Sequence, residues 1–146
     1  MLKALIVDDN ESQCLLLGHY LKGLCSCDAV QDGASAVVLF RQALRQGEPY
    51  ALLLMDLDLP YLNGYQAMRH MRALEDEHGY FPPHVCRFIV VSSLGSAFTV
   101  SADSDGCLVD TYFTKPLSQA DLLRKVKALS VLYGPPSADP GSSGPL

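Results

Sequence analysis

Short apolar runs alternate with stretches of helical periodicity along most of this chain. The apolar runs predict strands at residues 2–7, 25–30, 51–55, 88–91 and 108–113. Between these runs, apolar side chains recur every three or four positions, as at Ala36, Val37 and Phe40, which is typical of amphipathic helices. Strands that alternate with helices in this way indicate βαβ units. We therefore expect an α/β fold in which a doubly wound, five-stranded parallel sheet carries helices on both faces.

Capping residues mark the starts of two predicted helices. Asn10 with Gln13, and Ser118 with Asp121, match the pattern in which a polar side chain caps the first backbone N–H groups. Residues 96–105 are instead rich in Ser, Thr and Asp, so any helix there should be marginal. Residues 134–146 are mostly Gly, Pro and Ser, a composition that cannot form a packed core.

Composition and charge narrow the classes of protein. A chain of 146 residues, 49% of them hydrophobic, has room for one folded domain. The 11 basic and 16 acidic residues give a net charge of −5 without a Lys/Arg-rich run, so direct nucleic-acid binding is disfavoured. The apolar run before Asp8 is too short for a signal peptide or a membrane span. We therefore expect a cytoplasmic protein that binds neither nucleic acid nor membrane.

The cysteines and histidines do not form an evident metal site. The five cysteines are Cys14, Cys25, Cys27, Cys86 and Cys107. Their odd number and scattered spacing disfavour a disulfide framework, and we expect reduced thiols that pack as small hydrophobes. A metal could bind at Cys25-Ser-Cys27, but alternation along a strand also places both side chains on one buried face, and we favour that interpretation. The histidines are expected at the surface or its boundary: His19, His70, His78 and His84.

Polar residues stand at the ends of four predicted strands. They are Asp8 and Asp9 after the first, Asp56 after the third, Ser92 after the fourth and Lys115 after the fifth. Ligands of doubly wound sheets bind beyond the carboxyl ends of the strands, so one fold would bring these groups to one edge. Three carboxylates repel one another, and Mg²⁺, which prefers oxygen ligands, would compensate their charge.

This set of groups suits phosphoryl transfer. A carboxylate can act as the nucleophile once a metal ion and a cation neutralise charge on the transferring oxygens. Lys115 supplies such a cation, and the hydroxyl of Ser92 could bind a second phosphoryl oxygen. The position of Ser92 would then depend on whether the phosphoryl group is present, which is the basis of a switch.

Four segments, in this order and at these separations, resemble the response-regulator receiver family: LIVDDNE, LLMDLDLPYLNG, FIVVSS and DTYFTKPL. The resemblance covers residues 1 to about 132. It implies a flavodoxin-like fold with strand order 2-1-3-4-5. It also implies a receiver domain at residues 1–132, with residues 133–146 as a tail or linker.

The resemblance also assigns chemical roles. It implies that Asp56 is the phosphoacceptor, that Asp8 and Asp9 form the acidic metal pocket, and that Lys115 is the characteristic lysine. Asp9 would be a direct ligand of Mg²⁺, and the backbone carbonyl of Asp58 would be a further ligand. Because Asn10 is the better helix cap, we expect both acids before it to be available to the site.

The switch residues follow in the same way. The resemblance implies that Ser92 is the switch hydroxyl, that Tyr112 is the rotating aromatic, and that a cis peptide bond precedes Pro116. Two features depart from the family pattern: the polar loop predicted at residues 75–85, before the fourth strand, is long, and residues 96–105 lack the usual alanine-rich helix. The second departure affects the expected signalling surface, which the resemblance places around the fourth helix, fifth strand and fifth helix.

The expected partners are a sensor histidine kinase or a histidine phosphotransfer protein, followed by an unidentified downstream protein target. Slow self-catalysed dephosphorylation is also implied. One alternative is a phosphatase of the haloacid dehalogenase type, which the DLD sequence at residues 56–58 resembles. That class needs an acidic pair after the lysine, whereas the pair here precedes it. A second alternative is a degenerate receiver that only binds partners, but none of the acids nor the lysine has been lost.

Overall fold

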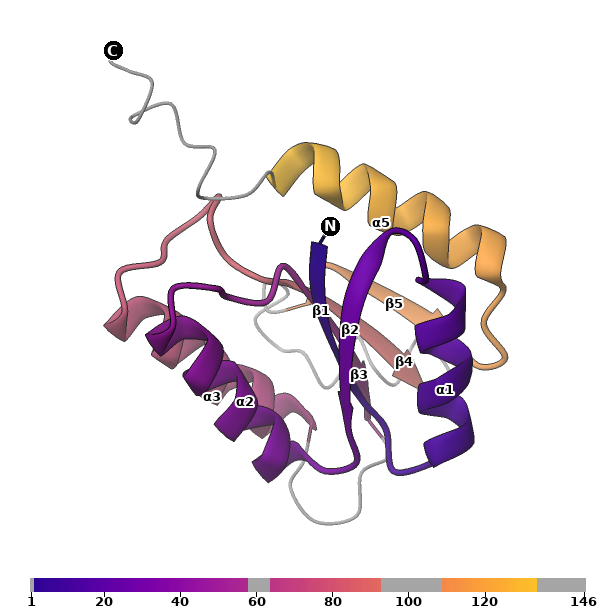
Figure 1. The fold of residues 1–146 in the computed structure, drawn as a ribbon, viewed down its shortest axis with the longest axis horizontal. Coiled ribbons are helices and arrows are strands. Elements are labelled where there is room, and N and C mark those ends of the chain that lie inside the picture. Colours follow the sequence, from indigo (N-terminus) through magenta and orange to yellow (C-terminus); the bar gives the residue numbers. More distant parts are fainter. Residues whose placement is uncertain (1, 58–63, 93–108, 134–146) are drawn as a thin grey trace.

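The computed structural model describes residues 2–57, 64–92 and 109–133. Five strands and four helices are assigned in these ranges (Figure 1). In chain order they are β1 (Leu2–Val7), α1 (Glu11–Tyr20), β2 (Cys25–Val30), α2 (Gly33–Arg45), β3 (Leu52–Asp56), α3 (Gly64–Glu77), β4 (Arg87–Ser92), β5 (Thr111–Thr114) and α5 (Gln119–Tyr133). The expectations for Asp58, residues 96–105 and the tail lie outside the described residues.

The strands form one parallel sheet in the order β2-β1-β3-β4-β5, which confirms the predicted fold class. Helices α1 and α5 cover one face, and α2 and α3 cover the other (Figure 1). All five residues of the central strand β3 are buried, as expected for a strand covered on both faces. Alternate residues of β1 divide between the two layers of core: Leu5 and Val7 face α2 and α3, whereas Ala4 and Ile6 face α1 and α5.

Both predicted helix caps are present. The side-chain oxygen of Asn10 accepts a hydrogen bond from the backbone N–H of Gln13 at 3.0 Å. The hydroxyl of Ser118 accepts one from the N–H of Asp121, also at 3.0 Å. These bonds satisfy donors that a helix leaves unpaired in its first turn, so they set where α1 and α5 begin.

The structure differs from the sequence prediction near the start of β5. The strand begins at Thr111 rather than residue 108. Asp110 lies before it and bonds to β4 in two ways: its N–H donates to the carbonyl of Phe88, and its carboxylate accepts from the N–H of Phe88. The carboxylate of Asp110 therefore accepts a hydrogen bond from β4 that a backbone carbonyl of β5 would otherwise accept.

Helix α3 also extends further than predicted, through Glu77 into the expected polar loop. The cause is Glu75, which is 3% exposed. Its carboxylate accepts a hydrogen bond from the N–H of Cys86 at 2.6 Å and pairs with Arg72 at 2.7 Å. Contacts with the chain that leads into β4 thus hold the last turns of α3.

The cysteines and histidines lie largely as expected. Free thiols are present at Cys14, Cys25, Cys27 and Cys86, and Cys27 alone of these is only half-buried. His19 and His70 are exposed, and the other two histidines are half-buried. None of the helices in the described ranges is long and apolar enough to cross a membrane.

Candidate functional site

Three aspartates gather at the edge of the sheet where the strands end. Asp8 directly follows β1 and is 1% exposed, and Asp56 is the last residue of β3 and is 2% exposed. Asp9 is exposed to solvent. Each of the three offers a carboxylate oxygen within 4.8 Å of the others. The topology therefore brings together the acids that the sequence predicted for one site.

Lys115, which follows β5, supplies the positive charge at this edge. Its Nζ lies 3.2 Å from Oδ2 of Asp8 and 3.3 Å from Oδ2 of Asp56. Burial by itself lowers the pKa of Lys115, but the carboxylates of Asp56 and Asp8 outweigh it, so this pKa is raised and the side chain stays an ammonium. Two carboxylates contact this ammonium and Asp9 adds a third to the cluster, so the described residues of the cluster carry an excess of negative charge.

Asp8 has a structural role as well as a place in the cluster. Its Oδ1 accepts a hydrogen bond from the backbone N–H of Asn10 at 2.9 Å, while its backbone carbonyl accepts one from Sγ of Cys14 at 3.3 Å. Asp8 still offers a carboxylate oxygen to the cluster, so the expectation that both acids are available to the site holds, although Oδ1 of Asp8 also bonds to the backbone. The contact with Cys14 was not predicted, because the sequence indicated only that this thiol packs as a small hydrophobe.

Ser92 and Tyr112 lie on neighbouring strands close to the acids. Ser92 is the last residue of β4, is 1% exposed, and lies one position beyond Val91, which pairs with Asp56. Its carbonyl accepts a hydrogen bond from the N–H of Lys115 at 2.9 Å. Tyr112 pairs with Val90 and packs against the core under α2 and α3. Alternation along β4 gives Ser92 the same sheet face as Val90, so the two predicted switch residues share a face.

Two further expectations concern the backbone. The peptide bond between Lys115 and Pro116 is cis, as the resemblance implied. The proposed metal ligand at Asp58 lies outside the described residues. The site that the structure describes consists of Asp8, Asp9, Asp56, Ser92 and Lys115, with Tyr112 beside it.

Comparisons with known proteins identify relatives of this chain. A family model for the response regulator receiver domain matches residues 4–127. The two-component response regulator ORR41 of Oryza sativa subsp. japonica is 29% identical over 125 residues, which cover 84% of this chain and 89% of the rice protein. The hybrid signal transduction histidine kinase L of Dictyostelium discoideum is 27% identical over 129 residues. That match covers 86% of this chain but only 7% of the kinase, so the chain spans a small part of this relative.

Solved structures show the same fold. A CheY-like response regulator receiver domain protein from Methanospirillum hungatei has a TM-score of 0.71 at 20% identity, over 90% of this chain and 96% of that one. TrrA from Thermotoga maritima, whose structure is a complex with Mg²⁺ and BeF, has a TM-score of 0.68 at 22% identity. This second match covers 88% of this chain and 99% of that one.

The family match spans most of the chain and includes every described residue of the acid cluster together with Lys115. Phosphorylation on an aspartate is the function of this family, whose members act as signalling switches. The chain therefore belongs to the response regulator receiver domain family of two-component systems.

Proposed function

We propose that Asp56 is the phosphoacceptor, and that a sensor histidine kinase or a histidine phosphotransfer protein supplies the phosphoryl group. The observation that carries this assignment is the place of Asp56 in the cluster. It ends the central strand, its carboxylate lies 3.3 Å from the ammonium of Lys115, and it shares the cluster with two more carboxylates. No other acid in the described ranges combines these three properties.

The donor set suits Mg²⁺. Asp8, Asp9 and Asp56 offer hard carboxylate oxygens within 4.8 Å of one another, and Asp9 leaves the site open to solvent. These three side chains would hold the ion, with the carbonyl of Asp58 proposed as a further ligand. When bound, Mg²⁺ would supply positive charge that neutralises the transferring oxygens.

Each residue of the site has a separate role in the transfer of the phosphoryl group. A carboxylate oxygen of Asp56 forms a bond to phosphorus while the bond from phosphorus to the donor's imidazole nitrogen breaks, and the imidazole leaves with the bonding electrons. The ammonium of Lys115 stabilises charge on one phosphoryl oxygen. The hydroxyl of Ser92 moves to donate a hydrogen bond to another phosphoryl oxygen. Tyr112, on the same sheet face, changes its position in response to this movement of Ser92. Attack of water on phosphorus later releases phosphate and restores Asp56.

A protein donor must also dock beside the site, and α1 offers a surface for it. This helix begins two residues after Asp9 and exposes Leu15 and Leu16, with Leu15 71% exposed. The exposed apolar area of this neighbouring pair, on the helix that follows Asp9, suits contact with another protein. We therefore place the donor over α1, and we place the downstream target at a separate surface that responds to Ser92 and Tyr112.

The proposal extends to the organisation of the chain. We propose that residues 1–132 are the receiver domain and that residues 133–146 form a tail or linker. The family match, which ends at residue 127, and helix α5, which extends to Tyr133, support this division. We also propose a cytoplasmic location, where the histidine phosphodonors of two-component systems transfer their phosphoryl groups.

The test is intact-mass measurement after incubation with a small acyl-phosphate donor, with and without Mg²⁺. Wild type should gain one phosphoryl group only with Mg²⁺, and Asp56→Asn should gain none. Asp32→Asn, which changes a helix-capping acid outside the cluster, serves as the control and should be labelled like wild type. Labelling of Asp56→Asn at the wild-type rate would remove Asp56 as acceptor. Repeated turnover without a covalent adduct would indicate a phosphatase, and no reaction at all would indicate a binding module.

A further inference from the structure

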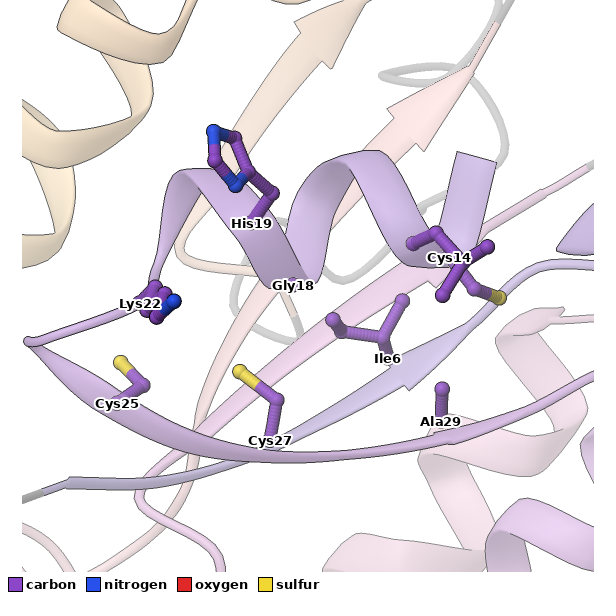
Figure 2. A pocket seen from close by; sticks show the side chains of 9 residues that line it. Ile6, Cys14, Gly18, His19, Lys22, Cys25, Cys27 and Ala29 are labelled. Atoms are coloured by element: carbon purple, nitrogen blue, oxygen red, sulfur yellow. The ribbon is translucent and has the colours of Figure 1, made fainter. Parts of the chain in front are cut away.

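A groove of about 440 Å³ lies between α1 and β2, apart from the acid cluster. Three thiols line it, those of Cys14, Cys25 and Cys27, together with His19 and Lys22 (Figure 2). Strand β2 is the last strand of the sheet on this side, so its outer edge pairs with no other strand in the described ranges. The groove therefore brings sulfur ligands together at an accessible edge of the domain.

We propose that this groove binds a soft monovalent cation, Cu(I), through the sulfur atoms of Cys25 and Cys27. The two residues are separated by one position on β2, and both sulfur atoms point toward α1 (Figure 2). Two residues of a strand rise about 6.6 Å, whereas two metal–sulfur bonds of about 2.3 Å span up to about 4.6 Å. Rotation of the two side chains toward each other closes this difference, and the backbone of β2 can stay in the sheet.

The arrangement favours Cu(I) over a divalent ion. In the part of the chain that the structure describes, three or more potential ligand atoms come within 4.8 Å of one another only at Asp8, Asp9 and Asp56. The thiols of Cys25 and Cys27 thus have no third ligand in place, whereas a closed zinc site needs four. Two soft thiolates satisfy Cu(I).

The third thiol of the groove has another role. Sγ of Cys14 donates to the carbonyl of Asp8, which lies at the carboxyl end of β1. Cys25 pairs with Leu2 at the opposite end of that strand. Cys14 therefore lies at the other end of the groove from Cys25, as Figure 2 also shows. The site consists of two thiols, and Cys14 provides an internal control.

The protonation of the thiols makes the site sensitive to pH. Burial, with a contribution from Cys27, raises the pKa of Cys25 to about 11, and burial with the charge of Asp28 raises the pKa of Cys27. On the α1 side, the ionisable groups of the groove are Cys14, His19 and Lys22. Both thiols are protonated at neutral pH, so binding releases two protons. Apparent affinity should therefore rise as the pH rises.

The experiment is anaerobic competition between the full chain and a chromophoric Cu(I) chelator such as bicinchoninate. Wild type should withdraw one Cu(I) per chain, and Cys25→Ser and Cys27→Ser should each lower the affinity at least 100-fold. Cys14→Ser and Cys86→Ser should stay within about threefold of wild type. A wild type that cannot compete would overturn the proposal, as would full binding by Cys25→Ser or an equal loss in Cys14→Ser.

A second measurement needs no variant and so does not depend on whether the substitutions fold. Maleimide labelling of the wild type is followed by peptide mapping, with and without one equivalent of Cu(I). The ion should protect Cys27, the half-buried thiol of the pair, and leave the labelling of Cys14 unchanged. Labelling of Cys27 that is equal in both samples would overturn the site. Neither measurement involves phosphorylation, so the outcome is independent of the function proposed for Asp56.

Discussion

The two ends of the sheet both carry clustered charges, but among the described residues the charges are balanced at only one of them. At the carboxyl end, Asp8, Asp9 and Asp56 form a cluster in which Asp8 and Asp56 contact the ammonium of Lys115. At the amino end of β4 and β5, two arginines meet two acids. The ion pairs there are Arg72 with Glu75 at 2.7 Å, Arg87 with Asp110 at 3.5 Å and Arg72 with Asp110 at 3.9 Å.

The four residues Arg72, Glu75, Arg87 and Asp110 form the balanced cluster, and several of them also make hydrogen bonds to the backbone. Glu75 accepts from the N–H of Cys86, and Asp110 accepts from the N–H of Phe88. Arg72 donates to the carbonyl of Cys86 at 2.8 Å, and its guanidinium lies 3.7 Å from the centre of the Phe88 ring. Each group thus joins α3 to the starts of β4 and β5, and the cluster holds the fold together.

The comparison teaches that burial of acids does not by itself indicate function. Glu75 is as deeply buried as Asp56, yet its partners neutralise it and satisfy its oxygens. In the part of the chain that the structure describes, the acids at the carboxyl end outnumber the cation beside them, and this excess of negative charge is what a metal ion would offset. Charge balance thus separates a structural cluster from a functional one.

The substitution Arg72→Ala should break the balanced cluster and give the largest effect. It leaves the buried carboxylate of Glu75 without its cation and removes the bond to the carbonyl of Cys86. We expect the free energy of unfolding to fall by about 2–4 kcal/mol, somewhat below the full cost for a fully buried pair because Arg72 is partly exposed. Urea denaturation measures the loss. Phosphorylation by a small donor, per folded molecule, should stay within about twofold of wild type.

Arg124→Ala is the matched control for this prediction. Arg124 pairs with Asp121 at 3.0 Å with the same sequence spacing as Arg72 and Glu75, but both side chains are more than half exposed. Surface pairs of this kind contribute little, so we expect no measurable change in stability. Equal losses in the two variants would contradict the distinction between a closed cluster and a surface ion pair.

Magnesium should stabilise the unbalanced cluster, an effect of intermediate size. A ligand that binds only the folded state at ten times its dissociation constant adds about 1.4 kcal/mol to the free energy of unfolding. Asp9→Asn should abolish this gain without lowering stability in the absence of the ion, because Asp9 is exposed. Urea denaturation at several Mg²⁺ concentrations measures both quantities. Glu11→Gln, which changes an exposed acid in the first turn of α1, should keep the full gain.

The sequence was sufficient to predict the carboxyl end of the sheet, and the reason is topological. In a doubly wound sheet, residues that directly follow the strands come to one edge, so the positions of Asp8, Asp56 and Lys115 follow from the order of the elements. The caps at Asn10 and Ser118 were predictable for a similar reason, because a cap depends on residues three positions apart.

The amino end could not be predicted, because its contacts join residues whose spacing carries no pattern. Glu75 was assigned to a polar loop, although its spacing of three residues from Arg72 is a visible helical signal. Its burial depends on the chain that leads into β4, eleven residues further on. The start of β5 was wrong for the same reason, since the side chain of Asp110 bonds to Phe88 across the sheet.

Leu15→Ser tests whether α1 forms part of the surface that binds the protein donor beside the acid cluster. It removes the most exposed of the large apolar side chains on this helix, at the surface where we place the protein donor. We expect phosphotransfer from a histidine phosphodonor protein to slow about fivefold, which corresponds to about 1 kcal/mol of lost contact. Phosphorylation by a small acyl phosphate should be unchanged. Val38→Ser, at an exposed apolar position on α2, is the control and should affect neither rate.

The smallest effect concerns pH and comes from the titration of Glu75 in the balanced cluster. Burial raises the pKa of Glu75, and Asp110 raises it further, whereas Arg72 and the bond from Cys86 lower it without cancelling the rise. The carboxyl group of Glu75 therefore binds its proton more tightly in the folded state than in the unfolded chain. Stability should fall as pH rises from the unfolded pKa, near 4.5, through the folded pKa, with a slope below about 1.4 kcal/mol per pH unit.

The variant Glu75→Gln has no titrating carboxyl group at this position. The difference in unfolding free energy between wild type and variant should therefore change with pH only between the unfolded and the folded pKa of Glu75. Denaturant unfolding of both proteins between pH 4 and pH 7 gives the difference directly. Wild type should lose stability relative to Glu75→Gln as pH rises. Arg72→Ala should lose stability more steeply, because in this variant the carboxylate of Glu75 has no cation beside it. The destabilisation by Arg72→Ala should therefore be smaller at acid pH than at neutral pH. A difference that is constant over the range would show that Glu75 is already ionised at its lower limit, and that Arg72 neutralises it completely.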